Sequence, residues 1–285
     1  MNARLKFLID CSIKRLTRAH QACPSCGSVK STTADRKYVV ARLERCLECD
    51  LLYRTPISSA EEQARYYQDA YKHGFTTDLP DSASLTELKK NRFNGTEKDY
   101  TERIQLLKAA TGDKRGRLLD FGCSWGYGTW QLQQAGWDTV GFEISKPRCA
   151  YARDKVGVNA HDDLDAITGT FDVFFSSHVL EHVPSITSTL AFAFSKLNKG
   201  GIFLSFIPNG SEAFREADYE SWHQLWGLDH PNFLDDKFFV RQLAGRQSFL
   251  ASTPVSGDAV KAWAAARRSA KGDLRGSELV VLVKV

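Results

Sequence analysis

Residues 118–132 read LLDFGCSWGYGTWQL, and this stretch decides the fold that we expect. A short apolar run ends in an acidic residue, and a glycine-containing turn leads from it into a helix-like segment. Asp120, Gly122, Ser124 and Gly126 occupy a D-x-G-x-G-x-G frame in which serine replaces the middle glycine. The glycines let the backbone approach a ligand closely, while the helix that follows presents its amide end. The stretch therefore predicts a nucleotide-like ligand at a strand end.

A carboxylate follows where such a ligand needs one. Glu143 stands seventeen residues beyond Gly126, at the end of the strand-like run VGFEIS. There it can accept hydrogen bonds from both hydroxyls of a ribose. A nicotinamide cofactor is the rival ligand, but GCSWGYG fits the G-x-G-x-x-G pattern poorly. The turn and the carboxylate together make a nucleoside-containing cofactor the expected ligand.

From residue 117 onward, short apolar runs alternate with helical stretches. This alternation is typical of an α/β fold in which helices cover a parallel sheet. The runs are RLLDF, DTVGFE, KVGVNA, FDVFF and GGIFLSFIPN, and the closing SELVVLVKV reads as a last strand.

Residues 178–182 spell HVLEH, which matches the H-x-x-E-H pattern of a group of zinc proteases. That chemistry needs a helix with both histidines on one face. The run FDVFFSS directly before His178 reads as a buried strand, and Pro184 leaves room for about one turn at most. We therefore expect HVLEH at a strand end that faces the ligand site.

The composition is that of an ordinary globular protein. The chain has 285 residues, of which 42% are hydrophobic and 25% are charged. No apolar stretch approaches the roughly 20 residues of a membrane span, and no signal peptide is recognisable, so we expect a cytoplasmic protein. Residues 1–54 hold eleven Lys/Arg against five Asp/Glu. We expect this basic excess to form a solvated face, with contact to phosphates or to an anionic membrane surface as the alternative.

Four parts are expected along the chain. Residues 1–20 predict an amphipathic basic helix, residues 21–55 a zinc ribbon, residues 56–115 a helical lid or linker, and residues 116–285 the α/β domain. In the linker, Ser59 and Glu62 form a capping-box pattern, and a break is expected at Asn94-Gly95. Tyr66, Tyr67 and Tyr71 follow the capping box and are candidates for a lid.

Two C-x-x-C pairs predict a zinc site. Nineteen residues separate them, a spacing suited to four thiolate ligands. Gly27 and Asp50 each follow a pair, where a tight turn lets backbone amides point at the sulfurs. We expect a structural staple, with nucleic-acid or partner recognition as the alternative. The expected ligands are Cys23, Cys26, Cys46 and Cys49.

From about residue 116 to the C-terminus the chain resembles the class I S-adenosylmethionine-dependent methyltransferases. LLDFGCSWG, GFEIS, FDVFFSSHVLEHV and LNKGGIFLSFIPN match four of their motifs in order. The resemblance implies a Rossmann-like, seven-stranded, doubly wound sheet. The arrangement CPSCGS, CLECDLLYRTP and YYQDAY also resembles a bacterial subgroup that joins a zinc ribbon to this domain, often in polysaccharide- and sugar-modifying pathways.

The resemblance also assigns cofactor contacts. Gly122, Ser124 and Gly126 of the turn that begins after Asp120 would wrap the methionine portion, and Glu143 would hold the ribose. The remaining contacts would be Ile144 beside the adenine, Asp162 or Asp163 at its acidic position, and Ser177 and His178 along the cofactor.

For a hydroxyl acceptor, methyl transfer needs a base, and histidine suits that role. His182, which the resemblance places in the reaction cleft, is our first candidate and His230 our second, with Glu181 as an orienting group. Aromatic residues in DYESWHQLWGLDHPNF, at 218–233, suit a sugar ring. We expect methyl transfer to a small-molecule or glycan acceptor, most simply a sugar hydroxyl. The alternatives are an RNA methyltransferase and a non-catalytic cofactor-binding protein.

Overall fold

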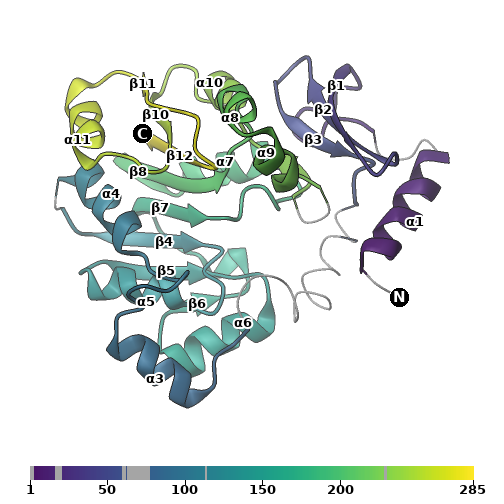
Figure 1. Cartoon of the computed structure of the whole chain (residues 1–285). Coiled ribbons are helices and arrows are strands. Elements are labelled where there is room, and N and C mark those ends of the chain that lie inside the picture. Colours follow the sequence, from purple (N-terminus) through teal and green to yellow (C-terminus); the bar gives the residue numbers. More distant parts are fainter. Residues whose placement is uncertain (1–2, 17–20, 60–61, 63–77, 113, 228–229) are drawn as a thin grey trace.

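The computed structural model describes residues 3–16, 21–59, 62, 78–112, 114–227 and 230–285 (Figure 1). Tyr66, Tyr67 and Tyr71, the candidates for a lid, lie outside the described residues. Ser59 and Glu62 make the two reciprocal hydrogen bonds of a capping box, at 2.7 and 3.2 Å, as the sequence predicts.

An eight-stranded sheet forms the larger part of the molecule, in the order β11-β10-β12-β8-β7-β4-β5-β6. The strands β4 to β8 pair in parallel, and β12 runs antiparallel between β8 and β10. The expected seven strands are present, and the two-residue β11 adds an eighth at one edge. The strands are β4 Arg117–Phe121, β5 Asp138–Phe142, β6 Ala160–His161, β7 Phe171–Ser177, β8 Leu197–Pro208, β10 Gln247–Ser252, β11 Ala270–Lys271 and β12 Glu278–Lys284.

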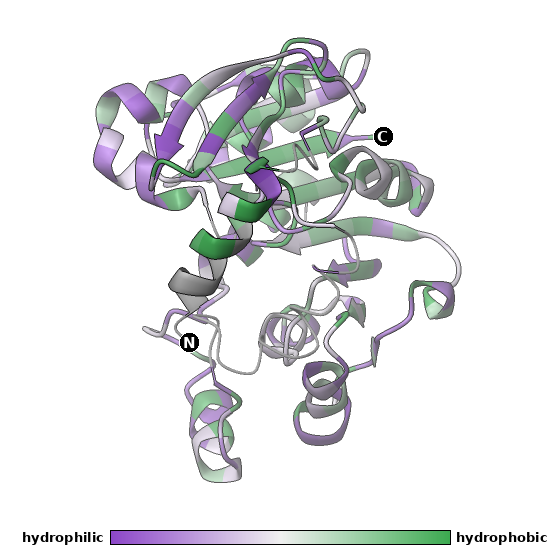
Figure 2. Cartoon of the chain, turned by 90° about the vertical axis from the view of Figure 1, so that its right-hand side faces the viewer, coloured by the Kyte–Doolittle hydropathy of each residue, from purple (hydrophilic) through white to green (hydrophobic). Residues whose placement is uncertain are grey.

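Side chains alternate along each central strand between two apolar layers. In β7, Phe174 packs into the layer beneath helices α7 and α10, whereas Phe175 packs into the opposite layer beneath α4, α5 and α11. The hydrophobic colouring of the central strands in Figure 2 reflects burial on both faces. These helices are α4 Thr101–Thr111, α5 Tyr127–Gln134, α7 Ile186–Ser195, α10 Asp236–Gln242 and α11 Gly257–Ala266.

Shorter helices complete this part of the chain. They are α3 Ser82–Lys90, α6 Lys146–Tyr151, the π-turn η3 Ala152–Val156, the 3-10 turn η4 Leu164–Ala166, α8 Glu212–Ala217 and α9 Tyr219–Leu225. KVGVNA differs from its expected strand. Val156 ends the π-turn, Gly157 has φ +79°, and only Ala160 and His161 pair with β5. Gly157, in the left-handed conformation, ends the helical segment at Val156, so only two residues of this run pair in the sheet.

Helix α4 belongs to the core of the large domain. Its Leu106 and Leu107 pack with Leu118 of β4. The break before it is present, because α3 ends at Lys90 and α4 begins at Thr101. Packing thus favours counting α4 with the α/β domain, although the sequence assigned it to a linker.

The cysteine-bearing module forms a second sheet, in the order β1-β2-β3-β9. Its strands β1 Ser31–Lys37, β2 Ala41–Cys46 and β3 Leu52–Thr55 are consecutive, whereas β9 Asn232–Phe233 comes from the α/β part of the chain. Helix α1 Ala3–Leu16 lies against this module, and its Cys11 is buried there. The two parts therefore share a sheet.

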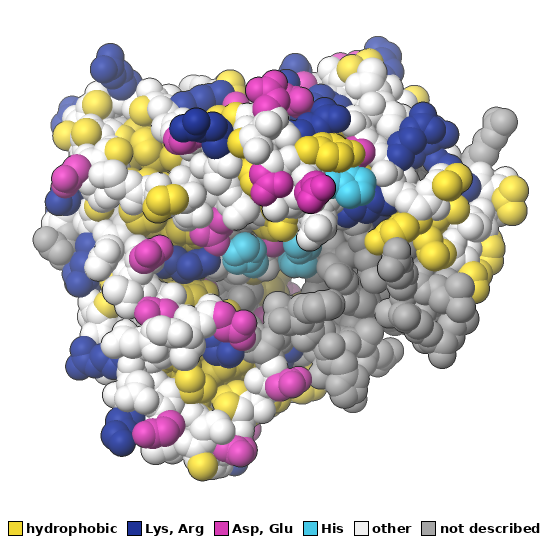
Figure 3. Space-filling model, in the orientation of Figure 1, with side chains coloured by type: hydrophobic (Ala, Val, Ile, Leu, Met, Phe, Trp, Pro, Cys, Tyr) yellow, Lys and Arg dark blue, Asp and Glu magenta, His cyan; other side chains and the backbone are white. Residues whose placement is uncertain are grey.

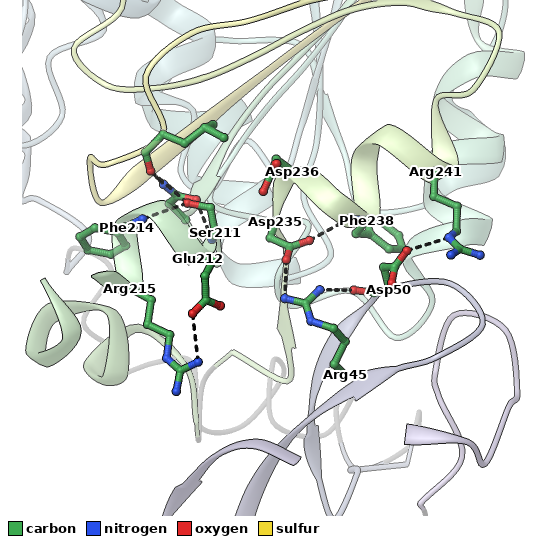
Figure 4. A network of polar contacts seen from close by, with 12 residues as sticks. Arg45, Asp50, Ser211, Glu212, Phe214, Arg215, Asp235, Asp236, Phe238 and Arg241 are labelled. Atoms are coloured by element: carbon green, nitrogen blue, oxygen red, sulfur yellow. Dashed lines mark hydrogen bonds and ion pairs between the residues drawn. The ribbon is translucent and has the colours of Figure 1, made fainter. Parts of the chain in front are cut away.

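Two ion pairs also join the module to helix α10 and the turn before it (Figure 4). Arg45 of β2 lies 2.7 Å from Asp235, whose other carboxylate oxygen caps α10 through the amide of Phe238. Arg241 of α10 lies 2.7 Å from Asp50. Asp235 is fully buried, so its pair with Arg45 is shielded from solvent.

Candidate active site

The predicted glycine turn lies at the carboxyl end of β4. Gly122, Ser124 and Gly126 have φ values of +84°, +52° and +87°, which explains the glycines and makes Ser124 the one strained position. A Cβ on Gly122 would fall 2.2 Å from the side chain of Val179. The turn is therefore packed directly against the HVLEH segment that follows β7.

Glu143 lies at the neighbouring strand end, after β5. It is 6% exposed and accepts hydrogen bonds from the amides of Ser124 and Ser145 at 2.9 and 2.8 Å. Burial raises its pKa, and those amides and Arg148 oppose the rise. Each oxygen of the Glu143 carboxylate accepts one of these hydrogen bonds and can accept a second, so both oxygens can still accept hydrogen bonds from ribose hydroxyls.

Asp120 lies near the carboxyl end of β4, just before the glycine turn. It is 2% exposed, and the hydroxyl of Thr129 donates to it at 2.6 Å. Burial raises its pKa to about 7, against the hydrogen bond from Thr129. The structure thus places Asp120 where it ties β4 to helix α5.

The expected adenine contacts follow β5 and β6. Ile144 is 44% exposed, which suits a flat apolar surface for a base. Asp163 is exposed and caps η4, because its side chain accepts a hydrogen bond from the amide of Asp165. Asp162 is half-buried.

His178 begins where β7 ends, and it has φ +54°. One ring nitrogen lies 2.8 Å from Glu278 and the other 3.5 Å from Glu181. Burial opposes its charged form, but the two carboxylates outweigh burial and raise the pKa to about 9. His178 is therefore protonated near neutral pH and cannot serve as a base there. Arg103 bonds Ser177 at 3.2 Å and Glu278 at 2.7 Å, so the other expected cofactor contact lies beside the same carboxylate.

Glu181, His182 and His230 converge next to this segment. Their candidate ligand atoms all lie within 4.8 Å of one another. Glu181 is 1% exposed, and His182 and His230 are half-buried. Burial alone would raise the pKa of Glu181, but His178, His182 and His230 lower it to about 2. Figure 3 shows histidine side chains gathered near the middle of one face, with carboxylates close to them.

The aromatic cluster after β8 is not an open sugar platform. Trp222 and Trp226 are each 1% exposed and pack against Leu43 and Leu52 of the cysteine module. His223 lies 2.5 Å from Asp35, which also accepts hydrogen bonds from Tyr219 and Trp226. The expectation that these aromatic faces meet an acceptor is wrong for the two tryptophans, because they fill the boundary between the two sheets.

Sequence reasoning missed two residues of the site. Glu278 pairs with His178, and Arg103 pairs with Glu278. Glu278 begins the last strand, and an antiparallel strand starts at the edge where its parallel neighbours end. That signal could have located Glu278, but nothing in the sequence singles out Arg103.

The four predicted zinc ligands form a cluster. Cys23 and Cys49 have their sulfurs 3.5 Å apart, as do Cys26 and Cys46. Gly27 and Asp50 have φ values of +73° and +64°, which confirms a tight turn after each pair. Burial raises the pKa of the Cys49 thiol to about 11, so a bound cation would be needed to hold it as thiolate.

Among the described residues, pockets lie beside the α/β sheet at both of its ends. One of about 160 Å³ is lined by Arg103, Phe206 and Glu278 and lies beside His178. The other, of about 300 Å³, is lined by Trp137, Lys199 and Lys284. It sits at the amino ends of the parallel strands, away from the glycine turn, so we do not assign it to the reaction.

The fold and the site define a class I S-adenosylmethionine-dependent methyltransferase. A glycine turn and a buried carboxylate stand at adjacent carboxyl ends of a parallel sheet, where α/β folds bind nucleotide cofactors. The chain belongs to the family described as the methyltransferase domain, whose model matches residues 91–247, more than half of its length. The expectation of an S-adenosylmethionine-dependent enzyme is thereby confirmed over the alternative of a non-catalytic cofactor-binding protein.

The chain is also similar to individual proteins over part of its length. A ubiquinone biosynthesis O-methyltransferase from Methylococcus capsulatus is 28% identical over 163 residues, which cover 45% of this chain and 69% of that protein. The plantazolicin methyltransferase BpumL, solved with a desmethylPZN analog and SAH, matches with a TM-score of 0.51 and 10% identity over 78% of this chain and 94% of that one. A TehB-like SAM-dependent methyltransferase from Corynebacterium glutamicum matches with a TM-score of 0.44 and 19% identity, over 71% and 96% of the two chains.

No helix in the described part of the chain has the length and apolar character needed to cross a membrane.

Proposed function

We propose that this methyltransferase modifies a hydroxyl group, most simply one of a sugar, on a small-molecule or glycan acceptor. The observation that supports it most is the cluster of His182 and His230 around the buried Glu181, one turn beyond the strand end that meets the cofactor loop. The similar protein from Methylococcus capsulatus is by name an O-methyltransferase, which fits an oxygen acceptor.

S-adenosylmethionine supplies an electrophilic methyl group on a sulfonium, so the chain has to align the acceptor and remove its proton. We assign Gly122, Ser124 and Gly126 to the methionine portion and Glu143 to the ribose. Gly122 has no room for a side chain because Val179 fills that space. In the simplest form of the reaction His182 takes the hydroxyl proton, and His230 is the second candidate.

An RNA acceptor is the second proposal, and the basic N-terminal region is the reason to keep it. Several of its cations are already engaged, since Arg45 pairs with Asp235 and Lys37 bonds the carbonyl of Trp226. Arg15 bonds the carbonyl of Val39. Arg45 is neutralised by a carboxylate, and Lys37 and Arg15 have donors committed to carbonyls, so fewer donors of this region are left for phosphates. We therefore favour the small-molecule acceptor.

The cysteine cluster is proposed to hold one Zn²⁺ as a structural staple. Four thiolates in two knuckles suit zinc, and the module has few apolar side chains for a core of its own.

Peripheral membrane contact through helix α1 also remains a proposal. Ile9, Ile13 and Leu16 are exposed along it, at 44%, 55% and 86%. Binding of the full chain to anionic vesicles, compared with an Ile13→Ser variant, tests it.

The acceptor is tested by methyl incorporation from labelled S-adenosylmethionine. A panel of nucleotide sugars, glycans and dihydroxy aromatic compounds is compared with RNA. We expect methylation of a hydroxyl compound, and we expect His182→Ala to lower turnover by about 10²-fold without changing cofactor affinity. Methylation of RNA alone would refute the small-molecule proposal.

A further inference from the structure

The carboxylate of Glu181 is the feature that the proposed reaction does not yet use. It is 1% exposed, and within the described residues neither of its oxygens accepts a hydrogen bond. Leaving a buried charged group without hydrogen bonds is strongly unfavourable in general. A carboxylate in such a state is expected where a ligand completes its surroundings.

Ion pairing with the histidines does not supply that completion. His178 lies 3.5 Å from Glu181 and His182 lies 3.7 Å from it, both beyond the 2.7–2.9 Å that is usual for charge-assisted hydrogen bonds. His178 is moreover held on its other side by Glu278, at 2.8 Å. The carboxylate thus lies within ion-pairing distance of two imidazoles but makes no short hydrogen bond to either.

His230 presents the nitrogen that a metal ion needs. Its Nδ1 donates a hydrogen bond to the carbonyl of Leu225, which leaves Nε2 as the unprotonated nitrogen of the neutral ring. Histidines that bind metals almost always donate their other ring hydrogen to a carbonyl or carboxylate in this way. The ring centroids of His182 and His230 lie 4.8 Å apart, which is close enough for both side chains to bind one ion.

The main chain fixes this arrangement from both sides. The amide of Asn232 donates to the carbonyl of Glu181 at 3.1 Å, and the side chain of Asn232 bonds the carbonyl of Val183. Pro231, next to His230, accepts a hydrogen bond from the amide of Arg54 at 2.9 Å. The cysteine module therefore holds the segment that brings His230 to the cluster.

We propose that Glu181, His182 and His230 bind a divalent transition-metal cation, and that the acceptor hydroxyl binds this cation during methyl transfer. The inference rests on the proposed hydroxyl acceptor, and it replaces the proton transfer to His182 of the simplest form by metal-assisted loss of that proton. Two imidazoles and one carboxylate suit Mn²⁺, Co²⁺ or Zn²⁺ better than Mg²⁺, which prefers an all-oxygen set. Three protein ligands leave at least one coordination position for the acceptor oxygen.

The cation changes the role of both histidines from base to ligand. An oxygen bound to a divalent cation loses its proton more easily, so the hydroxyl proton passes to water. The oxygen then attacks the methyl carbon and forms the C–O bond. The C–S bond breaks, and its electron pair stays on sulfur, which becomes a neutral thioether.

Binding of Mn²⁺ to the full chain, loaded with one equivalent of Zn²⁺ for the four-thiolate cluster and freed of excess Zn²⁺, tests this site. Mn²⁺ is chosen because it prefers oxygen and nitrogen ligands over the thiolates of the cysteine cluster. Titration followed by electron paramagnetic resonance measures how much of the aqueous Mn²⁺ signal disappears. We expect one bound Mn²⁺ per chain, with the dissociation constant raised by at least about tenfold in Glu181→Gln and in His230→Gln. His161→Gln, which changes a histidine outside the cluster, should bind as the unaltered chain does.

Two outcomes would overturn the site. One is a lack of Mn²⁺ binding by the unaltered chain, and the other is unchanged binding in both cluster variants. S-adenosylmethionine affinity, measured by calorimetry, should be the same in all four proteins and shows that the variants are folded. A chain that methylates a hydroxyl compound without binding Mn²⁺ here refutes the metal site alone. A chain that binds Mn²⁺ here but methylates only RNA refutes the proposed acceptor alone.

Discussion

Replacing Arg45 by alanine should destabilise the whole protein, because it would leave the carboxylate of Asp235 buried without its partner. Arg45 lies 2.7 Å from Asp235, and the two side chains are 18% and 0% exposed. Breaking a buried ion pair from one side costs about 3–5 kcal/mol in general. Asp235 keeps its hydrogen bond to the amide of Phe238, so we take the lower end, about 3 kcal/mol.

Arg241→Ala is the matched control, since it breaks a second ion pair between the same two parts (Figure 4). Arg241 and Asp50 are 51% and 27% exposed, and a pair of this kind contributes about 0–1 kcal/mol. At roughly 2–4 °C for each kcal/mol, Arg45→Ala should lower the melting temperature by about 6–12 °C and Arg241→Ala by less than about 4 °C.

Thermal unfolding followed by circular dichroism and calorimetry measures both effects. Adding Asp235→Asn to Arg45→Ala should restore part of the loss, because it removes the buried charge while the amide oxygen can still cap α10. Equal melting temperatures for Arg45→Ala and Arg241→Ala would refute the reasoning. So would an early, separate transition of the cysteine module in the unaltered chain, since we expect the shared sheet to join the two parts.

Three further predictions follow from the cofactor loop and the cysteine cluster. Glu143→Ala should weaken S-adenosylmethionine binding by roughly 1.5–3 kcal/mol, about 10- to 150-fold in Kd, and unchanged affinity in calorimetry would remove Glu143 from the site. Cys46→Ser should lose most of its zinc in elemental analysis together with the stability of the module, because binding and folding form one equilibrium; full zinc retention would contradict the four-thiolate site. Asp120 has a pKa of about 7 when folded and about 3.9 when unfolded, so its contribution to stability is largest below pH 4 and falls as the pH rises towards 7. The free energy of unfolding of Asp120→Asn, measured in urea, should therefore increase relative to that of the unaltered chain as the pH rises from 4 to 8. If the difference between the two proteins does not change with pH, Asp120 does not titrate in this range.

The sequence was sufficient wherever a feature is local. Gly122 and Gly126 were expected in a turn after a strand, and both have positive φ there. Cys23, Cys26, Cys46 and Cys49 were expected to cluster, and their sulfurs do. The sheet followed from apolar runs whose neighbours along the chain usually pack side by side. KVGVNA was less well predicted, because an apolar run of this length does not distinguish the end of a helix from a strand.

The chemistry around Glu181 depended on the tertiary structure. Taken as a motif, HVLEH would place two histidines on one helix. In the structure, His182 instead lies near His230, which is 48 residues further along the chain. Glu278, a hundred residues from His178, pairs with it through strand order alone. Local pattern encodes how a segment folds, because periodicity and turn chemistry act over a few residues. Which remote segments meet is decided by the packing of whole elements, here by β9 crossing to the sheet of the cysteine module and bringing His230 to Glu181.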